Sequence, residues 1–270
     1  MDGALLQLIS ADGTPLVARR TGHGTPVVFV HGSAGSLESW DPVLVHLGTR
    51  VQAWVYARRG YPPSGGSPRP KRYGDDVADL VAVVDAVGVR PHLVGASYGA
   101  TVAMHALLRG AVSARTLTIF EPPLFAAGPD LAPTVERYRQ LLAAGRRASA
   151  ARLFAEQAAR MPHELLGPTP DEQHGSPIVT GGAVGCLHDL EAMAADTTPL
   201  ASWAKLLTPA AILRGELTWE PMPSTLASLL AIMPASTHEI VLNGQSHFAT
   251  HTAPAQVADA IREVLARDPS

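Results

Sequence analysis

The pattern of apolar and polar positions changes several times along the chain. Residues 26–30, Pro-Val-Val-Phe-Val, form a continuous apolar run that is typical of a strand buried on both faces of a parallel sheet. Over 75–87 apolar residues recur at helical spacing, and Gly88 follows as a helix-ending residue. Together these patterns predict strands at 4–9, 15–20, 26–30, 51–56, 91–94 and 116–120, and helices at 38–47, 75–87 and 100–108. Strands that alternate with helices indicate a mostly parallel sheet with right-handed crossovers.

The alternation stops after residue 124 and resumes at residue 207. The intervening segment 125–206 is Ala-rich and helical in pattern, and it contains no convincing strand. After it we predict strands at 209–213 and 238–242 and helices at 224–232 and 254–266. The predicted fold class is therefore α/β, with a mostly parallel central sheet, helices on both of its faces, and an inserted helical cap. Residues 1–124 and 207–270 form the core of this prediction, and 125–206 form the cap or lid.

The predicted cap has a consequence for binding. Ligands of open α/β sheets bind at the carboxyl edge of the strands, which an insertion at this place would cover. The segment also contains Gly and Pro breaks over 167–177 and further glycines at 181, 182 and 185. We therefore expect it to open more easily than the sheet and to influence substrate choice.

Composition and charge narrow the classes of partner. The chain has 270 residues, of which 46% are hydrophobic and 17% charged, as expected for a globular protein with a sizeable core. A net charge of −3 argues against a nucleic-acid groove or a polybasic membrane patch. No uninterrupted apolar run of about 18 residues and no signal-peptide pattern is visible. We expect a cytoplasmic protein, a monomer or homodimer, that acts on a small molecule and binds neither nucleic acid nor membrane.

Cofactor and metal patterns are weak in this sequence. Cys186 is the only cysteine, which excludes an intrachain disulfide and a cysteine-based zinc site. No G-x-G-x-x-G fingerprint follows a strand, and no Gly-Lys-Ser/Thr follows the clustered glycines. His247 and His251 have the spacing of a metal pair, but no HExxH glutamate or third ligand accompanies them. We predict no cofactor and no metal.

The segment 95–99, Gly-Ala-Ser-Tyr-Gly, carries the strongest chemical signal. It lies between an apolar strand and an Ala-rich helix, which is the context of a nucleophile elbow centred on Ser97. Such a turn needs small flanking residues, and positions 95, 96, 99 and 100 are glycine or alanine. The turn would also direct the amide of Tyr98, at a helix N-terminus, toward a developing oxyanion.

With these residues the chain resembles the α/β-hydrolase superfamily over nearly its full length. The matching features are His31-Gly32 at a strand end, Arg59-Gly60 in the next loop, the Ser97 elbow, the helical insertion, and Gly-Gln-Ser-His-Phe at 244–248. The resemblance implies that His247, after the last strand, is the general base for Ser97. It also implies a second oxyanion donor just after Gly32, for which Ser33 is favoured and Ala34 is an alternative. These motifs are specific for the fold but not for a substrate, because this fold hosts many reactions.

The acid of a Ser–acid–His order is harder to assign. The family usually carries an aspartate two or three residues after the glycine that ends the penultimate strand, and this position holds Thr218. Some relatives carry the acid after the strand that follows the elbow helix, which here is Glu121. We favour Glu121; Glu216 and the absence of a true acid remain alternatives.

Substrate contacts are predicted from large side chains near the expected pocket. Trp40 follows the loop after the strand at 26–30, and the predicted cap contributes Met161, Met193 and Trp203. Each of these side chains is also of a type that commonly packs in a core. Residues 57–60, Ala-Arg-Arg-Gly, stand where the family often has Asp-x-Arg-Gly, so Ala57 replaces the aspartate and we expect Arg59 to be structural.

These observations lead to a ranked set of functions. The leading hypothesis is a cofactor-free serine hydrolase that cleaves an ester, thioester or lactone of a small apolar substrate through an acyl-enzyme. The alternative is a non-hydrolytic tailoring enzyme on the same fold, catalysing an elimination, cyclisation or acyl transfer in secondary metabolism. The displaced acid and the large cap motivate that alternative. A non-enzymatic ligand receptor is the third hypothesis, and the intact Ser97 and His247 count against it.

Overall fold

One eight-stranded sheet organises the chain in the computed structural model, which describes residues 3–67, 69–168 and 182–268. The strand order is β1-β2-β4-β3-β5-β6-β7-β8, parallel from β4 to β8, with β2 antiparallel to both β1 and β4. The strands are β1 (Ala4–Ile9), β2 (Pro15–Thr21), β3 (Thr25–Val30), β4 (Val51–Tyr56), β5 (His92–Ala96), β6 (Leu117–Phe120), β7 (Ala210–Gly215) and β8 (His238–Leu242). The predicted α/β fold class is confirmed.

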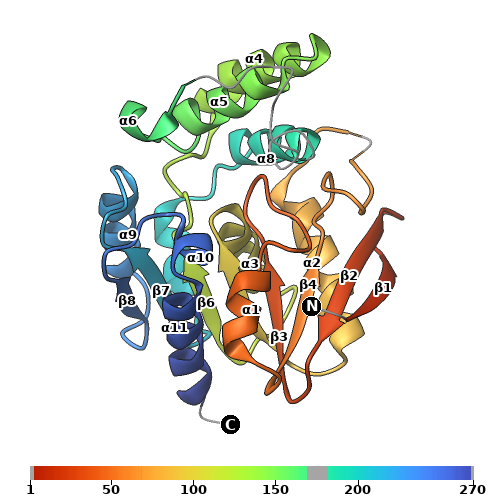
Figure 1. Cartoon of the computed structure of the whole chain (residues 1–270), viewed down its shortest axis with the longest axis vertical. Coiled ribbons are helices and arrows are strands. Elements are labelled where there is room, and N and C mark those ends of the chain that lie inside the picture. Colours follow the sequence, from red (N-terminus) through yellow and green to blue (C-terminus); the bar gives the residue numbers. More distant parts are fainter. Residues whose placement is uncertain (1–2, 68, 169–181, 269–270) are drawn as a thin grey trace.

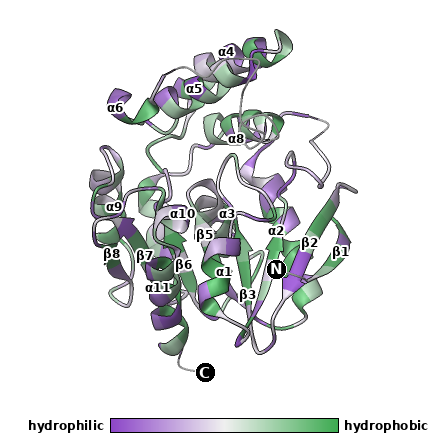
Figure 2. Ribbon diagram, in the orientation of Figure 1, coloured by the Kyte–Doolittle hydropathy of each residue, from purple (hydrophilic) through white to green (hydrophobic). Residues whose placement is uncertain are grey.

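Helices cover both faces of the sheet and enclose two apolar layers. One layer contains Leu80 of α2 and Met104 of α3, and the other contains Leu44 of α1 and Ile261 of α11. Figure 2 shows the strands between these helices as largely hydrophobic. The helices of the core are α1 (Asp41–Leu47), α2 (Tyr73–Val87), α3 (Tyr98–Leu108), α9 (Met222–Leu230), α10 (Ala249–Thr252) and α11 (Pro254–Ala266). Removing the buried apolar side chains of both layers from water is the main favourable term in folding.

The helix predicted at 38–47 begins only at Asp41. The residues before it form a turn, in which the Ser36 amide donates to the Ser39 hydroxyl over 2.8 Å. Pro42 then stands at the start of the helix, where its missing N–H costs nothing.

The segment between β6 and β7 is helical in its described residues and lies above the carboxyl ends of the strands (Figure 1). Its elements are η1 (Pro129–Leu131), α4 (Ala132–Ala143), α5 (Arg147–Gln157), α6 (His163–Leu166), α8 (Ala183–Ala194) and η2 (Leu200–Lys205). α8 lies between the α4–α5 pair and the sheet (Figure 1). Most of the Gly/Pro stretch predicted to break this segment, together with glycine 181, lies outside the described residues.

The register of the parallel strands aligns their carboxyl ends. Val30 pairs with Gly95, Ala96 with Phe120, and Gly215 with Leu242. The loops that follow β3, β5, β6, β7 and β8 therefore meet at one edge of the sheet, beneath the helical insertion. In open α/β sheets this edge is the usual place for a ligand.

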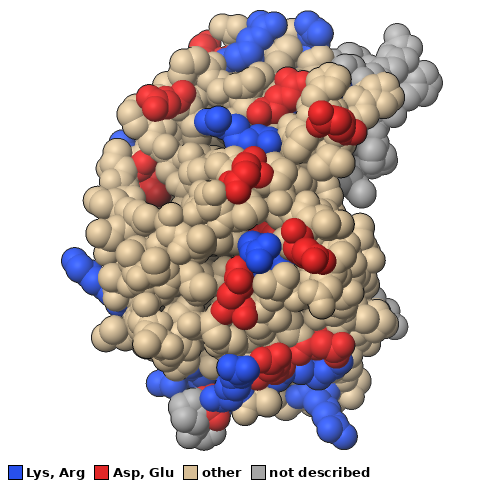
Figure 3. Space-filling model, turned by 90° about the vertical axis from the view of Figure 1, so that its left-hand side faces the viewer, with Lys and Arg blue, Asp and Glu red and all other residues tan. Residues whose placement is uncertain are grey.

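The face of the molecule in Figure 3 has no large patch of charges of one sign. Acidic and basic side chains are interspersed there among uncharged ones. Within the described part of the chain, none of the helices has both the length and the apolar character of a membrane span.

Candidate active site

Ser97 occupies a strained turn between β5 and α3. Its backbone has φ 53° and ψ −124°, a conformation that non-glycine residues rarely adopt, and its amide donates to the Phe120 carbonyl over 2.7 Å. The neighbouring glycines allow the strand and the helix to approach closely. A Cβ at Gly99 would lie 2.3 Å from the Val30 carbonyl oxygen, and one at Gly95 would lie 2.6 Å from the Ala100 Cα. This is the geometry of a nucleophile elbow, in which the serine side chain stands above the sheet edge.

Glu121 directly follows the next strand, β6, and contacts His247. The Glu121 carboxylate is fully buried, and its Oε2 lies 2.5 Å from His247 Nδ1. Its Oε1 accepts hydrogen bonds from the Gly215 amide at 2.7 Å and from the Thr218 hydroxyl at 2.6 Å. Three donors therefore surround one buried carboxylate, as a charged acceptor in a dry site requires. Because Nδ1 is engaged by Glu121, Nε2 is the ring nitrogen that remains for proton transfer.

Glu216, the alternative acid, lies elsewhere. Its side chain is exposed, and its Oε2 accepts from the Gly244 amide over 2.7 Å. It thus supports the turn that precedes His247 and does not reach the imidazole. Of the two candidate acids, the structure brings only Glu121 to the histidine.

Aromatic rings fix the orientation of His247. Phe120 stacks on the imidazole with ring centroids 5.8 Å apart, and Trp219 meets it edge-on at 5.9 Å. A ring that contacts one stacked aromatic ring, one edge-on aromatic ring and a carboxylate loses little further freedom when it acts in a reaction.

Two amides near Ser97 point to an oxyanion site. Among the described residues, neither the Ser33 amide nor the Tyr98 amide donates to a protein group. The Ala34 amide, in contrast, donates to the Tyr61 hydroxyl over 3.2 Å. Ser33 is therefore better suited than Ala34 to bind an oxyanion together with Tyr98.

Two cavities meet at these residues, and Ser33, Ser97 and His247 line both of them. The larger has a volume of about 590 Å³ and contains Trp40, Glu38 and His251 in its wall. The smaller has a volume of about 30 Å³ and lies under the helical insertion. Its remaining wall is mostly apolar: Tyr98, Pro123, Phe125, Phe154, Ala158, Ala159, Met193, Thr218, Trp219 and Met222.

The predicted substrate contacts divide between these cavities and the core. Trp40 lines the larger cavity and Met193 the smaller one, whereas Met161 lines neither. Trp203 is 2% exposed, packs edge-on against His105 with centroids 5.0 Å apart, and lines a separate cavity of about 50 Å³. Trp203 is therefore placed in the packing beside α3, because η2 returns the chain to the core before β7.

The comparisons with known proteins agree with this architecture. The model of the alpha/beta hydrolase family matches residues 27–260. The chain belongs to the alpha/beta hydrolase family. Among curated proteins, none matches its sequence significantly.

Several solved structures superimpose on nearly the whole chain. An alpha/beta hydrolase from Sphaerobacter thermophilus is 27% identical, with a TM-score of 0.81 over 96% of this chain and 100% of its own. A thermophilic esterase from Thermogutta terrifontis is 19% identical, with a TM-score of 0.81 over 99% and 100% of the two chains. An enol-lactonase from Burkholderia xenovorans is 18% identical, with a TM-score of 0.77 over 96% and 100%. At such low identity the last two likenesses show the fold alone.

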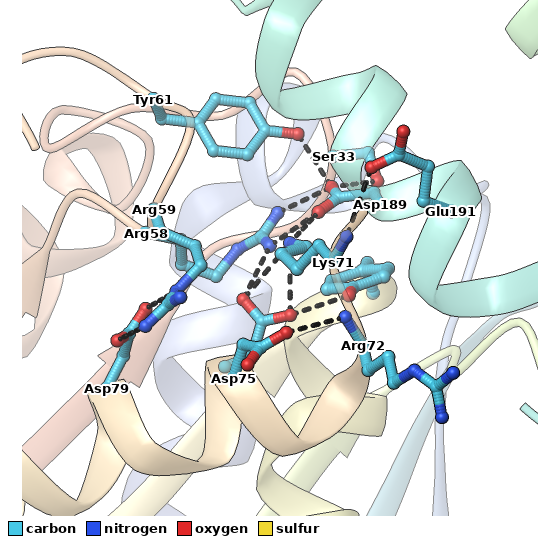
Figure 4. Close-up of polar contacts among 12 residues, drawn as sticks. Ser33, Arg58, Arg59, Tyr61, Lys71, Arg72, Asp75, Asp79, Asp189 and Glu191 are labelled. Atoms are coloured by element: carbon cyan, nitrogen blue, oxygen red, sulfur yellow. Dashed lines mark hydrogen bonds and ion pairs between the residues drawn. The ribbon is translucent and has the colours of Figure 1, made fainter. Parts of the chain in front are cut away.

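This alpha/beta hydrolase also contains a buried ionic cluster that sequence reasoning missed. The side chains of Arg58, Lys71, Asp76 and Asp189 are all 0% exposed and form ion pairs with one another. Asp189 comes from α8 of the insertion, and Figure 4 shows it beside Ser33, Arg58 and Lys71. Removing one partner from such a buried set costs about 3–5 kcal/mol. No sequence signal pairs Asp189 with residues more than 100 positions away.

Arg59 forms two further ion pairs, which are separate from this cluster. Its guanidinium is buried, donates to Asp79 from Nε at 2.8 Å, and reaches Asp12 of the β1–β2 turn at 2.8 Å. These contacts join α2 to the first hairpin and involve no residue of the two cavities. The expectation of a structural role for Arg59 agrees with these contacts.

Cys186 is the one cysteine of the chain, and its side chain is buried. Burial raises the pKa of the Cys186 thiol to about 11, so it is protonated near neutral pH. In the described part of the chain, no three His, Cys, Asp or Glu side chains are placed to hold a metal ion.

Proposed function

We propose that this alpha/beta hydrolase is a cofactor-free serine hydrolase of carboxylic esters, with thioesters and lactones as related substrates. The observation that carries the proposal is the hydrogen bond between Glu121 and His247, at the wall of the two cavities that also contain Ser97. A buried carboxylate on Nδ1 sets the histidine tautomer that a general base needs.

In the acylation step, His247 Nε2 accepts the proton of the Ser97 hydroxyl while Oγ attacks the acyl carbon. The carbonyl oxygen becomes an oxyanion, which the amides of Ser33 and Tyr98 stabilise. Glu121 stabilises the imidazolium without taking its proton. The imidazolium then gives that proton to the leaving alkoxide, the C–O bond breaks, and the alcohol departs.

In the deacylation step, a water molecule replaces the alcohol. His247 accepts a proton from this water as its oxygen attacks the acyl-enzyme, and the same two amides stabilise the second oxyanion. The protonated histidine returns the proton to Ser97 as the ester bond to the enzyme breaks, which releases the acid. No oxidant, reductant or metal takes part.

The two cavities suggest the orientation of the bound ester. We place the acyl group in the smaller apolar cavity, because it lies enclosed under the insertion. We place the leaving group in the larger cavity, which has room for a bulkier alcohol. The smaller volume of about 30 Å³ accommodates roughly two or three water-sized groups. In this proposal residues 125–206 act as the cap, and short-chain esters are the preferred substrates.

The non-hydrolytic alternative had its main support in the displaced acid. The contact of Glu121 with His247 weakens that argument, because an acid partner is present on a different strand. We therefore rank ester hydrolysis above elimination, cyclisation or acyl transfer.

Covalent labelling tests the proposal directly. A fluorophosphonate probe should add once to the protein, at Ser97, and p-nitrophenyl acetate should be hydrolysed. Ser97→Ala should abolish both, whereas Ser113→Ala, at an exposed serine that lines neither cavity, should change neither. A folded protein that is labelled elsewhere or not at all, and that lacks esterase activity, would favour the non-hydrolytic alternative.

A further inference from the structure

We infer that Asp189 of α8 is a positioning residue for the oxyanion site, acting through a buried network that fixes the Ser33 and Tyr98 amides relative to Ser97. The inference rests on the proposed function, because it assigns those two amides to the oxyanion. It gives the helical insertion a part in forming the site, in addition to covering it.

Asp189 is the centre of the network. Its Oδ2 accepts from the Ser33 hydroxyl at 2.7 Å and from the Tyr61 hydroxyl at 2.6 Å. Arg58 donates to both carboxylate oxygens at 2.8 Å, and Lys71 donates to Oδ1 at 2.6 Å. One carboxylate thus binds the side chain of an oxyanion-site residue and two fully buried cations (Figure 4).

Arg58 also binds the backbone of the two residues that precede Ser33. Its Nε donates to the His31 carbonyl at 2.9 Å, and its NH2 group donates to the Gly32 carbonyl at 3.1 Å. The Arg58 amide donates to His31 Nε2 at 3.1 Å. The loop that follows β3 is therefore bound at two consecutive carbonyls and at the next side chain, which leaves little freedom to the Ser33 amide between them.

Tyr98, which carries the second amide, is connected to the same cations through its hydroxyl and Asp76. The Tyr98 hydroxyl donates to Asp76 Oδ2 at 2.6 Å, and Lys71 lies 3.0 Å from that oxygen. Lys71 therefore bridges the two carboxylates, one of which binds Ser33 and the other Tyr98. The two residues whose amides would share an oxyanion are connected by a continuous chain of charge-assisted hydrogen bonds, which are shorter and stronger than neutral ones.

Close packing brings α8 near enough for this contact. A Cβ at Gly185 of α8 would lie 2.4 Å from the Tyr61 ring, so the helix rests directly on that ring. Asp189 follows Gly185 by four residues and lies on the same face of the helix. Burial disfavours its charge, but Arg58 and Lys71 outweigh burial and hold the pKa of Asp189 well below its usual range. The carboxylate is therefore charged at every pH at which the enzyme would work.

The test compares two buried aspartates that each pair with an arginine. Asp189→Asn removes the charge at the network, and Asp79→Asn removes the charge that pairs with Arg59 away from the cavities. With p-nitrophenyl acetate we expect Asp189→Asn to lower kcat ten- to a hundredfold, with KM within threefold of wild type. The affinity for phenylboronic acid, which forms a tetrahedral adduct with the serine, should fall by a similar factor. Asp79→Asn should keep kcat within twofold even where it lowers the urea midpoint.

Hydrogen exchange provides a readout that does not depend on activity. Peptides covering residues 31–36 should exchange at least tenfold faster in Asp189→Asn than in wild type and should not change in Asp79→Asn. Should Asp189→Asn not fold, Tyr61→Phe removes one hydroxyl between Asp189 and the Ala34 amide, and a smaller loss in kcat with unchanged KM is expected.

The outcomes separate the two proposals. Unchanged kcat, boronate affinity and exchange in Asp189→Asn overturn the positioning role while the ester hydrolase stands. Equal losses in the Asp189 and Asp79 variants overturn it too, since they would indicate general destabilisation. A wild type without esterase activity or Ser97 labelling overturns the proposed function, and faster exchange at 31–36 would then still support the structural link between α8 and this loop.

Discussion

Thr218 donates its hydroxyl to Glu121 over 2.6 Å, so the residue at the position where relatives of the family usually carry the acid supports an acid on the neighbouring strand. The Gly215 amide, three residues earlier, donates to the same oxygen at 2.7 Å. The end of β7 and the turn after it therefore contribute hydrogen-bond donors to a carboxylate that follows β6. Two neighbouring parallel strands can exchange such a role because their carboxyl ends lie in register.

Glu121→Gln should lower kcat for p-nitrophenyl acetate by about two to four orders of magnitude with the fold intact. The amide cannot stabilise an imidazolium, and its N–H₂ group favours the wrong histidine tautomer. Glu216→Gln, at the exposed turn, is the matched control and should cost less than about tenfold in kcat. Steady-state kinetics and circular dichroism of both variants check this. A larger loss of kcat in Glu216→Gln than in Glu121→Gln would show that Glu216, and not Glu121, is the acid.

Thr218→Val should lower kcat on the order of tenfold, because one of the donors to the buried carboxylate is lost while the side-chain volume is kept. Thr218→Ser retains the hydroxyl and should keep kcat within about threefold of wild type. The measurement is kcat and KM of both variants with one ester. Equal kinetics for the valine and serine variants would show that the Thr218 hydroxyl does not support Glu121 in the reaction.

The sequence was sufficient for the parts of the structure that short segments encode. The run at 26–30 and the Gly-Ala-Ser-Tyr-Gly turn each contain their own structural cause, namely β-branched residues and small flanking side chains, and the predicted fold class followed from their alternation. The position of Glu121 at a strand end also placed it on the correct edge of the sheet, because parallel strands end together.

The parts that sequence reasoning missed depend on contacts between distant segments. Asp189 meets Arg58 across 131 positions, and nothing near either residue indicates the other. Trp203 is of a residue type that often lines pockets, yet in η2 its ring packs against His105. Trp219 and Phe154, which line the smaller cavity, gave no periodic signal because they lie in a loop and on a weakly buried helix. Packing of the insertion on the core decides all four cases.

The stability of the protein should fall as pH is lowered through the range in which unfolded histidine takes up a proton. Burial and the neighbouring Arg58 lower the pKa of His31 to about 3, so this residue stays neutral when folded while the unfolded chain protonates near pH ~6.5. Between these values His31 costs about 1.4 kcal/mol of unfolding free energy per pH unit. In His31→Gln the loss between pH 7 and pH 5 should be smaller by about 2 kcal/mol.

Urea unfolding of wild type and His31→Gln at both pH values measures this difference. Burial also lowers the pKa of His92, to about 4, so a residual loss of the same sign remains in the variant. An identical pH dependence in the two proteins would show that His31 is not the neutral buried group described above.

Hydrogen exchange should divide the insertion into two parts, whereas the sequence alone predicts that all of it opens more easily than the sheet. α8 buries most of its inner face and is bound through Asp189, whereas in α5 the buried side chains are Ala148 and Ala150. We expect α8 to exchange as slowly as β3 and α5 to exchange at least tenfold faster, because local opening follows the lack of buried contacts. Peptide-resolved exchange by mass spectrometry checks this. Uniform exchange across the insertion would mean that it opens as one lid.

The smaller cavity should set the length of acyl chain that the enzyme accepts. Its volume of about 30 Å³ suits an acetyl or propionyl group, so kcat/KM should fall steeply from p-nitrophenyl acetate to the octanoate. Phe154 forms part of its wall from α5, and Phe154→Ala should raise kcat/KM for the octanoate relative to the acetate by roughly tenfold, since one or two methylene groups are worth about 1–3 kcal/mol in an apolar pocket. Leu165→Ala, an exposed residue of α6 that lines neither cavity, is the control and should leave the ratio unchanged. If wild type already prefers the octanoate and Phe154→Ala has no effect on the ratio, the acyl group occupies the larger cavity, and the direction of the bound ester is the reverse of the one proposed.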